Sequence, residues 1–472
     1  MLQQFKADST RKFTTDVFTI PYKDGYILYI PEVQLVAGVD SGVFKIVQAI
    51  KQHQPLEDNM QNREFLTAMQ KLGVFQPRPI RNTVPQGKFL PTHVTLSLTS
   101  RCNLKCIYCY ARAGERIADM DENLLDAALR FVVSNAIEKN EKELIVSFHG
   151  EGEPTANSKL FEKAVRKSTK IAKENGLKVR FTMSTNGMWG TSARDVIADN
   201  FKNLSVSLDG PPEIQNAQRP TVSGTPSFPI IMKNLQFIET KGVEYGLRVT
   251  VLPEGIGSML PFLNMVSDSL KCNWVHFEPV FLTGRAVDMH CEDNSQETFF
   301  RRFVDEYHHA VSRGYELGIR IAYSGCRGSH YTPNFCNVTG PELNFFVSTK
   351  GIVSSCYEII DPETPKGKFT VYGRYDRIKG KFVFDNRRLN TLRTFDVSKM
   401  KHCKDCFAKW NCSGDCFARS DIHLSVNGAV TASRESPRCY ANRETTLREL
   451  VLNGLASDVM DRESIRSPTE RR

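Results

Sequence analysis

The sequence lacks the features that mark membrane, exported and nucleic-acid-binding proteins. It has no run of about 18 apolar residues, so it offers no membrane span. Its first residues, MLQQFKADSTRKF, lack the apolar core of a signal peptide, and we therefore expect a cytoplasmic protein. No basic run with interleaved aromatic residues is present, which argues against a nucleic-acid partner. Internal repeats and low-complexity tracts are also absent.

What the sequence contains is an ordinary globular composition with many cysteines. Of its 472 residues, 40% are hydrophobic and 24% are charged, and the net charge is +9 at pH 7. This length allows two or three domains. Thirteen cysteines without a signal peptide indicate metal or redox chemistry in a reducing compartment, rather than disulfide bonds.

Residues 1–80 are predicted to form a small module of their own. Residues 26–39 favour two short strands, and residues 41–52 favour a helix with Ser41 as its cap. Residues 63–75 favour a second helix. Strands followed by helices suggest a winged-helix-like fold.

Strands alternate with helices after a proline-rich linker at 81–92. This alternation implies parallel βαβ units, and about six of them favour a partial β/α barrel over 93–320, with a helical bridge from 290. From 321 the periodicity weakens, as expected where metal clusters replace a hydrophobic core, and 451–472 is expected to be a tail. The expected strands are 93–99, 144–148, 179–184, 203–208, 246–252 and 273–280, and the expected helices include 121–139, 157–175, 192–200 and 226–241.

Three cysteines share one short loop, SRCNLKCIYCY. Cys102, Cys106 and Cys109 have the spacing C-x3-C-x2-C, and Tyr108 precedes the last thiol. Three thiolates on a tight loop can hold three irons of a 4Fe–4S cluster and leave the fourth iron open to a small molecule. A zinc knuckle is the alternative, but zinc would want another Cys or His within about 20 residues. No further Cys or His follows Cys109 before His149, which argues against zinc. The loop also comes directly after an expected barrel strand, and β/α barrels carry their active sites at the carboxyl ends of their strands.

Three more short motifs follow the next three expected strands in order. Each motif alone would be read as an ordinary turn. Their order at successive strand ends favours one shared site. HGEGEPT (149–155) contains Gly152, Glu153 and Pro154, STNG (184–187) contains Ser184 and Asn186, and SLDG (207–210) contains Ser207, with Arg219 further on.

A second constellation of cysteines lies in the last third of the chain. Zinc would accept the same thiolates, so spacing alone leaves a double zinc ribbon open. Cys272 and Cys291 fit no pattern and are expected to be structural. The pattern runs from Cys336 through Gly351 to Cys356, then Cys403-x2-Cys406-x5-Cys412-x3-Cys416 and Cys439, with Cys326 as a candidate eighth ligand.

These motifs together resemble a known family. The loop around Tyr108 resembles the signature loop of radical S-adenosylmethionine (radical SAM) enzymes, and the later cysteines match the seven-cysteine pattern of the SPASM domain. HGEGEPT resembles the family's GGEP motif, with Glu151 where the first glycine usually stands. Stretches such as PTHVTLSLTSRCNLKCIYCYARAGE, FEPVFLTGRA and STKGIVSSCYEI are most similar to the His-Xaa-Ser system maturase group.

The resemblance implies an α/β fold: a partial (β/α)6 radical SAM barrel, an N-terminal recognition module and a SPASM domain at 321–450. It implies S-adenosylmethionine and three 4Fe–4S clusters as cofactors. In the family, the strand-end backbone at 152–154 binds the methionine amino group. Ser184 and Asn186 are then candidates near the ribose, while Ser207 and Arg219 suit the methionine carboxylate. By the family's interleaving, Cys326, Cys336, Cys356 and Cys416 would hold the first auxiliary cluster, and Cys403, Cys406, Cys412 and Cys439 the second.

The implied function is radical modification of a ribosomally made precursor peptide. A 5′-deoxyadenosyl radical would abstract a hydrogen atom, and a C–C, C–S or C–O crosslink would close. The N-terminal module would bind the leader peptide as an added β-strand, and a flavodoxin or ferredoxin would supply electrons. No general base is identifiable; many relatives carry His-Asp where this chain has Gln215-Asn216. The alternatives are formylglycine formation, as in sulfatase maturases, and a non-catalytic metal-cluster module that binds peptides.

Overall fold

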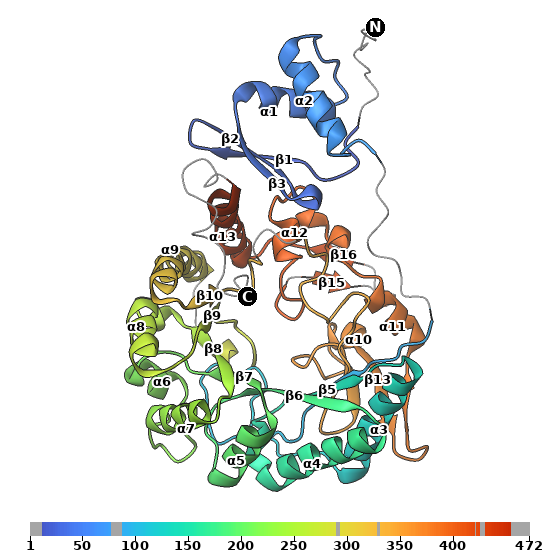
Figure 1. The fold of residues 1–472 in the computed structure, drawn as a ribbon, viewed down its shortest axis with the longest axis vertical. Helices are drawn as coiled ribbons and strands as arrows, with labels where there is room; N and C mark the ends of the chain where they lie inside the picture. Colours follow the sequence, from blue (N-terminus) through green and yellow to red (C-terminus); the bar gives the residue numbers. More distant parts are fainter. Residues whose placement is uncertain are drawn as a thin grey trace.

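The computed structural model describes residues 12–76, 87–288, 293–327, 331–420, 422–424 and 430–454. Figure 1 shows an open arc of strands and helices, with the N-terminal module beyond the helices α12 and α13. Cys291, residues 81–86 of the predicted linker and residues 455–472 of the predicted tail lie outside the described residues.

The arc is a partial barrel of six parallel strands, β4 to β9, that pair in sequence order. Alternate side chains of β5, such as Leu144, Val146 and Phe148, are fully buried, which is the period of a strand in a β/α unit. Helix α4 buries Phe161, Ala164, Val165 and Ile171 on one face, at helical spacing. The strands are β4 (His93–Leu96), β5 (Glu143–Phe148), β6 (Lys178–Thr185), β7 (Asn203–Ser207), β8 (Glu244–Val251) and β9 (Trp274–Pro279), followed by β10 (Arg320–Ala322).

The barrel helices lie on the outer side of the arc (Figure 1). The four helices expected between the strands are confirmed within one or two residues, and the helical bridge is a long helix, α9. The helices are α3 (Glu122–Glu138), α4 (Ser158–Glu174), α5 (Thr191–Asn200), α6 (Pro212–Gln218), α7 (Phe228–Thr240), α8 (Met259–Ser269) and α9 (Asp293–Leu317).

The C-terminal region continues the barrel sheet. Strand β11 pairs parallel with β4, so the sheet runs without a break from β10 at one end to β14 at the other. Phe345, Val353 and Tyr372 belong to the same hydrophobic core as the barrel, so the expectation that clusters replace the core after 321 is wrong. The elements are β11 (Phe346–Val347), β12 (Ile352–Ser354), α10 (Gly367–Thr370), β13 (Val371–Asp376), β14 (Lys381–Phe384), α11 (Asn386–Arg393), α12 (Lys409–Cys412), β15 (Ile422–Leu424), β16 (Val430–Ser433) and α13 (Pro437–Gly454).

The N-terminal module is a three-stranded antiparallel sheet followed by two helices. Helix α1 is capped by Asp40, whose side chain accepts from the Val43 N–H at 2.9 Å, so the prediction of Ser41 as the cap is wrong by one residue. Asn59 caps α2 in the same way, and the helix begins at Met60, three residues before the expected start. The elements are β1 (Phe18–Tyr22), β2 (Gly25–Ile30), β3 (Leu35–Val39), α1 (Ser41–Lys51) and α2 (Met60–Lys71).

Helix α13 extends further than expected, because it continues through residue 454 where the sequence predicted a tail from 451. Its last turns are held by apolar contacts: Leu450 is fully buried against the sheet of the N-terminal module.

No described helix combines the length and apolar character needed to cross a membrane.

Candidate active site

The loop with Cys102, Cys106 and Cys109 lies at the carboxyl end of β4 and is fastened to the barrel on two sides. The Lys105 and Ile107 N–H groups donate to the carbonyls of Pro220 and Gln218 at 2.8 and 3.1 Å. On the other side, Arg285 donates to the carbonyl of Cys106 at 3.3 Å and to that of Ala113 at 2.7 Å. The backbone that carries the three thiols is therefore fixed by the fold, and not by the thiols themselves.

The three thiols share one largely buried environment in which donors approach the sulfur atoms. All three are free cysteines. The Leu104 N–H donates to Cys102 Sγ at 3.4 Å, and Arg219 Nη1 lies 3.9 Å from Cys106 Sγ. Burial, with the neighbouring thiols, raises the pKa of Cys102 to about 12 and that of Cys106 to about 11. Such thiols fit a metal cluster, whose binding replaces their protons.

The loop with Gly152 packs directly against the start of the cysteine loop. A Cβ atom at Gly152 would lie 2.3 Å from the Arg101 carbonyl oxygen, so only glycine allows this approach. The Glu153 N–H donates to the same Arg101 oxygen at 2.9 Å. This contact brings the second strand-end motif to the first.

Glu153 uses its carboxylate to tie two strand ends together. It is 3% exposed and accepts hydrogen bonds from the Thr155 hydroxyl at 2.7 Å, the Thr185 hydroxyl at 2.8 Å and the Asn186 N–H at 2.8 Å. Burial raises its pKa against the effect of these donors. Its side chain therefore holds the ends of β5 and β6 in position relative to each other. Pro154 begins the short 3-10 helix Pro154–Asn157 that follows.

Asn186 is the third motif's contact with the cysteine loop. Its side-chain amide donates to Asn103 Oδ1 at 2.8 Å and lies 3.7 Å from Cys102 Sγ. Ser184, two residues earlier on β6, lines the lumen of the barrel. Ser207 is half-buried at the end of β7, beside Arg248 of β8 in the strand register.

Arg219 is paired with Asp209, a residue that the sequence analysis did not single out. The two charges form an ion pair of 2.9 Å, with side-chain exposures of 10% and 0%. The Tyr108 hydroxyl also donates to Asp209, and the guanidinium lies 5.2 Å from the Tyr108 ring centre. Asp209 thus joins two predicted site residues. Its place in SLDG was the signal that could have found it.

A polar cavity of about 500 Å³ fills the barrel lumen. His149 lies at the end of β5 with its ring 4.4 Å from that of Tyr357, and burial lowers its pKa to about 4. A neutral imidazole therefore faces the interior at neutral pH. The lining also includes His93, Ser147, Thr182, Ser184 and Ser205.

The C-terminal cysteines gather in two neighbourhoods. The first contains Cys336, Cys356 and Cys416. Burial is the main cause that raises the pKa of Cys356 and of Cys416, and the charges of the neighbouring thiolates in this group raise both pKa values further. The Cys326 sulfur lies 3.9 Å from the hydroxyl of Thr446 in α13. The charge of a Cys326 thiolate would also raise the pKa of Tyr29. The second neighbourhood, in which the thiols influence one another in the same way, contains Cys403, Cys406, Cys412 and Cys439.

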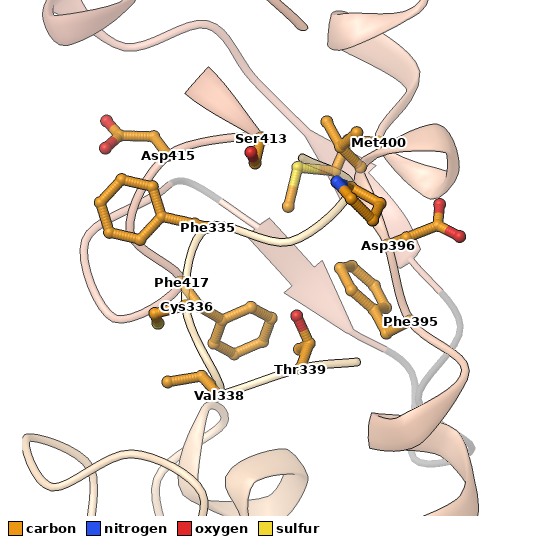
Figure 2. A pocket seen from close by; sticks show the side chains of 12 residues that line it. Phe335, Cys336, Val338, Thr339, Phe395, Asp396, Met400, Ser413, Asp415 and Phe417 are labelled. Carbon is orange, nitrogen blue, oxygen red and sulfur yellow. The ribbon is translucent and has the colours of Figure 1, made fainter. Parts of the chain in front are cut away.

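In the described part of the chain, no three His, Cys, Asp or Glu side chains converge closely enough to hold a single metal ion. A 4Fe–4S cluster spreads its ligands over several irons, so its cysteines need not converge in this way. Figure 2 shows a small cavity near Cys336 that is lined by the apolar residues Phe417, Val338 and Met400 and also by the polar residues Thr339, Asp396, Ser413 and Asp415.

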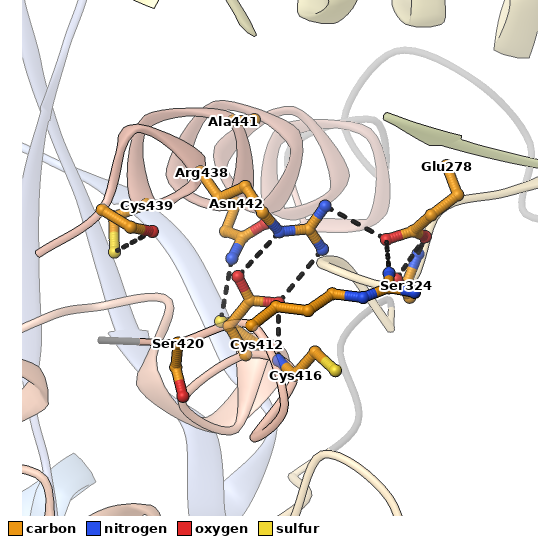
Figure 3. Close-up of polar contacts among 12 residues, drawn as sticks. Glu278, Ser324, Cys412, Cys416, Ser420, Arg438, Cys439, Ala441 and Asn442 are labelled. Carbon is orange, nitrogen blue, oxygen red and sulfur yellow. Dashed lines mark hydrogen bonds and ion pairs between the residues drawn. The ribbon is translucent and has the colours of Figure 1, made fainter. Parts of the chain in front are cut away.

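A buried network of charges joins the two neighbourhoods to the barrel (Figure 3). Arg438, next to Cys439, donates to Asp415 at 2.7 and 3.0 Å and pairs with Glu278 of β9 at 3.0 Å. Asp415 in turn accepts from the Cys416 N–H at 2.7 Å. Sequence reasoning missed this network, because no local pattern connects residues 160 positions apart.

A second arginine and an asparagine extend the network. Arg419 pairs with Glu358 at 2.9 Å. The Asn442 side-chain amide donates to Cys412 Sγ at 3.1 Å and accepts from the Tyr323 hydroxyl at 2.6 Å. Buried ion pairs and hydrogen bonds therefore lie beside cysteines of both predicted auxiliary sites.

The departure of Glu151 from the expected glycine has a structural counterpart. Its carboxylate accepts from the Thr349 N–H at 2.7 Å and from the Thr349 hydroxyl at 3.1 Å. Thr349 lies in the turn between β11 and β12. Glu151 thus fastens the C-terminal region to the strand-end loop.

Comparison with known proteins places this geometry in a class. Residues 96–265 match the model of the radical SAM superfamily. An uncharacterized protein of Methanocaldococcus jannaschii is 29% identical over 177 residues, which is 36% of this chain and 55% of that protein. The serine-type anaerobic sulfatase-maturating enzyme of Bacteroides thetaiotaomicron is 24% identical over 186 residues, 38% of this chain and 44% of that enzyme. The chain thus matches about half the length of these relatives.

Solved structures extend the likeness beyond the matched segment. Native anSMEcpe with bound AdoMet superposes with a TM-score of 0.57 at 18% identity, covering 78% of this chain and all of that one. The same protein with AdoMet and the Cp18Cys peptide gives a TM-score of 0.56 at 18% identity, over 78% of this chain and 99% of that one. The family match therefore covers residues 96–265, and the rest of the chain lies outside it. The chain has the α/β fold of the anSMEcpe structures.

Proposed function

We propose that this chain is a radical SAM enzyme that modifies a ribosomally made precursor peptide and closes an intramolecular crosslink in it. The observation that carries the proposal is the loop with Cys102, Cys106 and Cys109, fixed at the end of β4 against the Gly152 loop. When bound, the 4Fe–4S cluster and S-adenosylmethionine supply the radical chemistry for hydrogen abstraction.

The chain's own residues would hold and orient these cofactors. The three thiols would ligate the cluster, with Asn186 and Arg219 near the sulfur atoms of Cys102 and Cys106. The backbone at 152–154 would receive the methionine amino group, and Ser184 and Ser207 lie at the ends of the next strands. Arg219 already pairs with Asp209, so binding of the methionine carboxylate would require the guanidinium to share its donors between two carboxylates.

The two C-terminal neighbourhoods would hold two auxiliary 4Fe–4S clusters, giving three clusters in the whole chain. Their thiols fit this role, because they are buried or partly buried, form no disulfide bonds and are grouped. The assignment of Cys326 to the first cluster stays a prediction; its sulfur lies 3.9 Å from the Thr446 hydroxyl. An electron donor such as flavodoxin or ferredoxin is part of the proposal.

A peptide is the proposed substrate, and the N-terminal module is its proposed recognition element. Among the described residues, β1 and β3 are the edge strands of the module's sheet, and an edge strand can accept an extended peptide as a further strand. The structure of anSMEcpe with Cp18Cys is that of a similar fold with a bound peptide. The finer assignment to the His-Xaa-Ser group rests on the sequence resemblance alone.

A sulfatase-type maturase is an equally supported second candidate. The sulfatase-maturating relative from Bacteroides thetaiotaomicron favours it. In that case the product would be formylglycine, made from a Cys or Ser of the target. The precursor-peptide function rests on the N-terminal sheet, in which β1 and β3 are the edge strands among the described residues.

One anaerobic experiment separates these candidates. The reconstituted enzyme is incubated with S-adenosylmethionine, a reductant and either a precursor peptide encoded nearby or a sulfatase-derived peptide. Formylglycine is an aldehyde and reacts with a hydrazide, whereas a crosslink suppresses fragment ions between the joined residues in tandem mass spectra. A protein that binds iron but never forms 5′-deoxyadenosine would instead be a non-catalytic binding module.

A further inference from the structure

The N-terminal module contacts the short helix that ends in Cys412. Asp16 receives two partners from this helix: Lys409 Nζ at 2.6 Å and the Trp410 indole N–H at 2.7 Å. The Tyr29 hydroxyl of β2 donates to Asn411 Oδ1 at 3.0 Å. Three consecutive residues before Cys412 are thus bound by side chains nearly 400 positions earlier in the chain.

The α12 side of these contacts is buried, whereas the Asp16 side chain is 33% exposed. Lys409 and Trp410 are each 7% exposed, and Asn411 is fully buried. A buried ammonium needs an anionic partner, and Asp16 is the ion-pair partner that Lys409 has among the described residues. The remaining described bond of its ammonium is a weaker one, to the Lys404 carbonyl at 3.3 Å.

The module also contacts the other segment of the same neighbourhood. Phe18, Ile20 and Ile27 form an apolar cluster with Leu450 of α13, the helix whose first turn carries Cys439. Figure 1 shows the blue module lying directly against α12 and α13. Both helices that contribute thiols to the second neighbourhood are therefore covered by the N-terminal module.

We propose that the N-terminal module forms part of the wall of the second auxiliary cluster site, with Asp16 and Tyr29 as positioning residues for Cys412. The inference rests on the proposed function for the identity of the cluster. It gives the module a structural task in addition to leader recognition. Deleting residues 1–80 would then damage the cluster site as well as peptide binding, so truncation cannot isolate the recognition role.

Point variants in the full-length chain test this proposal. Asp16→Asn removes the charge facing Lys409, and Tyr29→Phe removes one hydroxyl. Asp58→Asn is the matched control, since Asp58 lies in the same module but pairs with Arg63 on the surface, at exposures of 50% and 61%. Each protein is reconstituted anaerobically, and iron release to a chelator is followed over time.

We expect the wild type to hold about twelve irons per chain, from three clusters. In Asp16→Asn about four of them should leave at least about tenfold faster, because the unpaired Lys409 charge disrupts α12. Tyr29→Phe should show a smaller acceleration of the same four irons, and Asp16→Glu should restore retention. The emission of Trp410 in the apoprotein should shift to the red in Asp16→Asn, while Asp58→Asn behaves like the wild type.

Equal iron release from Asp16→Asn, Tyr29→Phe and Asp58→Asn would overturn the proposal while leaving the enzyme assignment intact. A wild type that binds only about four irons would overturn the auxiliary clusters, and with them this inference. If Asp16→Asn fails to fold by circular dichroism, Tyr29→Phe decides the outcome alone, because it leaves the Lys409 ion pair in place.

Discussion

Replacing Arg438 with methionine removes the guanidinium between Asp415 and Glu278 while keeping a side chain of similar length. The Arg438 side chain is 3% exposed, and its two ion pairs are 2.7 and 3.0 Å long. Burial alone would raise the pKa of Glu278, yet Arg438, His276 and Arg419 hold it well below its usual value. Without Arg438, two buried carboxylates lose their main countercharge.

Breaking a buried pair by removing one partner costs about 3 to 5 kcal/mol. This corresponds to roughly 100- to 5,000-fold more frequent local opening, since each 1.36 kcal/mol is about a factor of ten. Amide hydrogen exchange measured by mass spectrometry reports such opening for the peptides that cover 412–420 and 437–445. Arg63→Met is the control, because its pair with Asp58 is exposed to water. Exchange in Arg438→Met that matches this control would refute the reasoning.

Three further outcomes are expected. Changing Cys102, Cys106 and Cys109 together to alanine should leave about eight of about twelve irons and abolish S-adenosylmethionine cleavage; unaltered cleavage would contradict the site. Cys412→Ala should remove peptide product yet keep some 5′-deoxyadenosine formation, provided circular dichroism shows a folded protein; full product without that cluster would contradict its role. Because the pKa of His149 is lowered from 6.5 to about 4, the unfolded chain binds a proton that the folded one does not. Stability should therefore fall by about 3 kcal/mol as the pH drops through this window, and His149→Gln should lose that dependence in urea unfolding.

The sequence predicted the parts of the fold that have a local signature. The strands β4 to β9 alternate with amphipathic helices, and each site motif follows a strand end, so position along the chain fixes position in space. The capping of α1 was wrong by one residue, because Asp40 and Ser41 are both good caps and only the backbone decides between them. The pairing of β11 with β4 and the partnership of Arg438 with Glu278 depend on tertiary contacts, for which a single sequence carries no periodic signal.

The hydrogen bonds between β4 and the C-terminal region restrict how the molecule can move. The Thr95 and Ser97 N–H groups donate to the carbonyls of Phe345 and Val347, each at 3.0 Å. A hinge motion between the barrel and the cysteine-rich region would have to break these backbone hydrogen bonds. We therefore expect the two regions to move as one rigid body. Access for the proposed peptide substrate would then come from the peptide's own flexibility, and not from opening between the cluster sites.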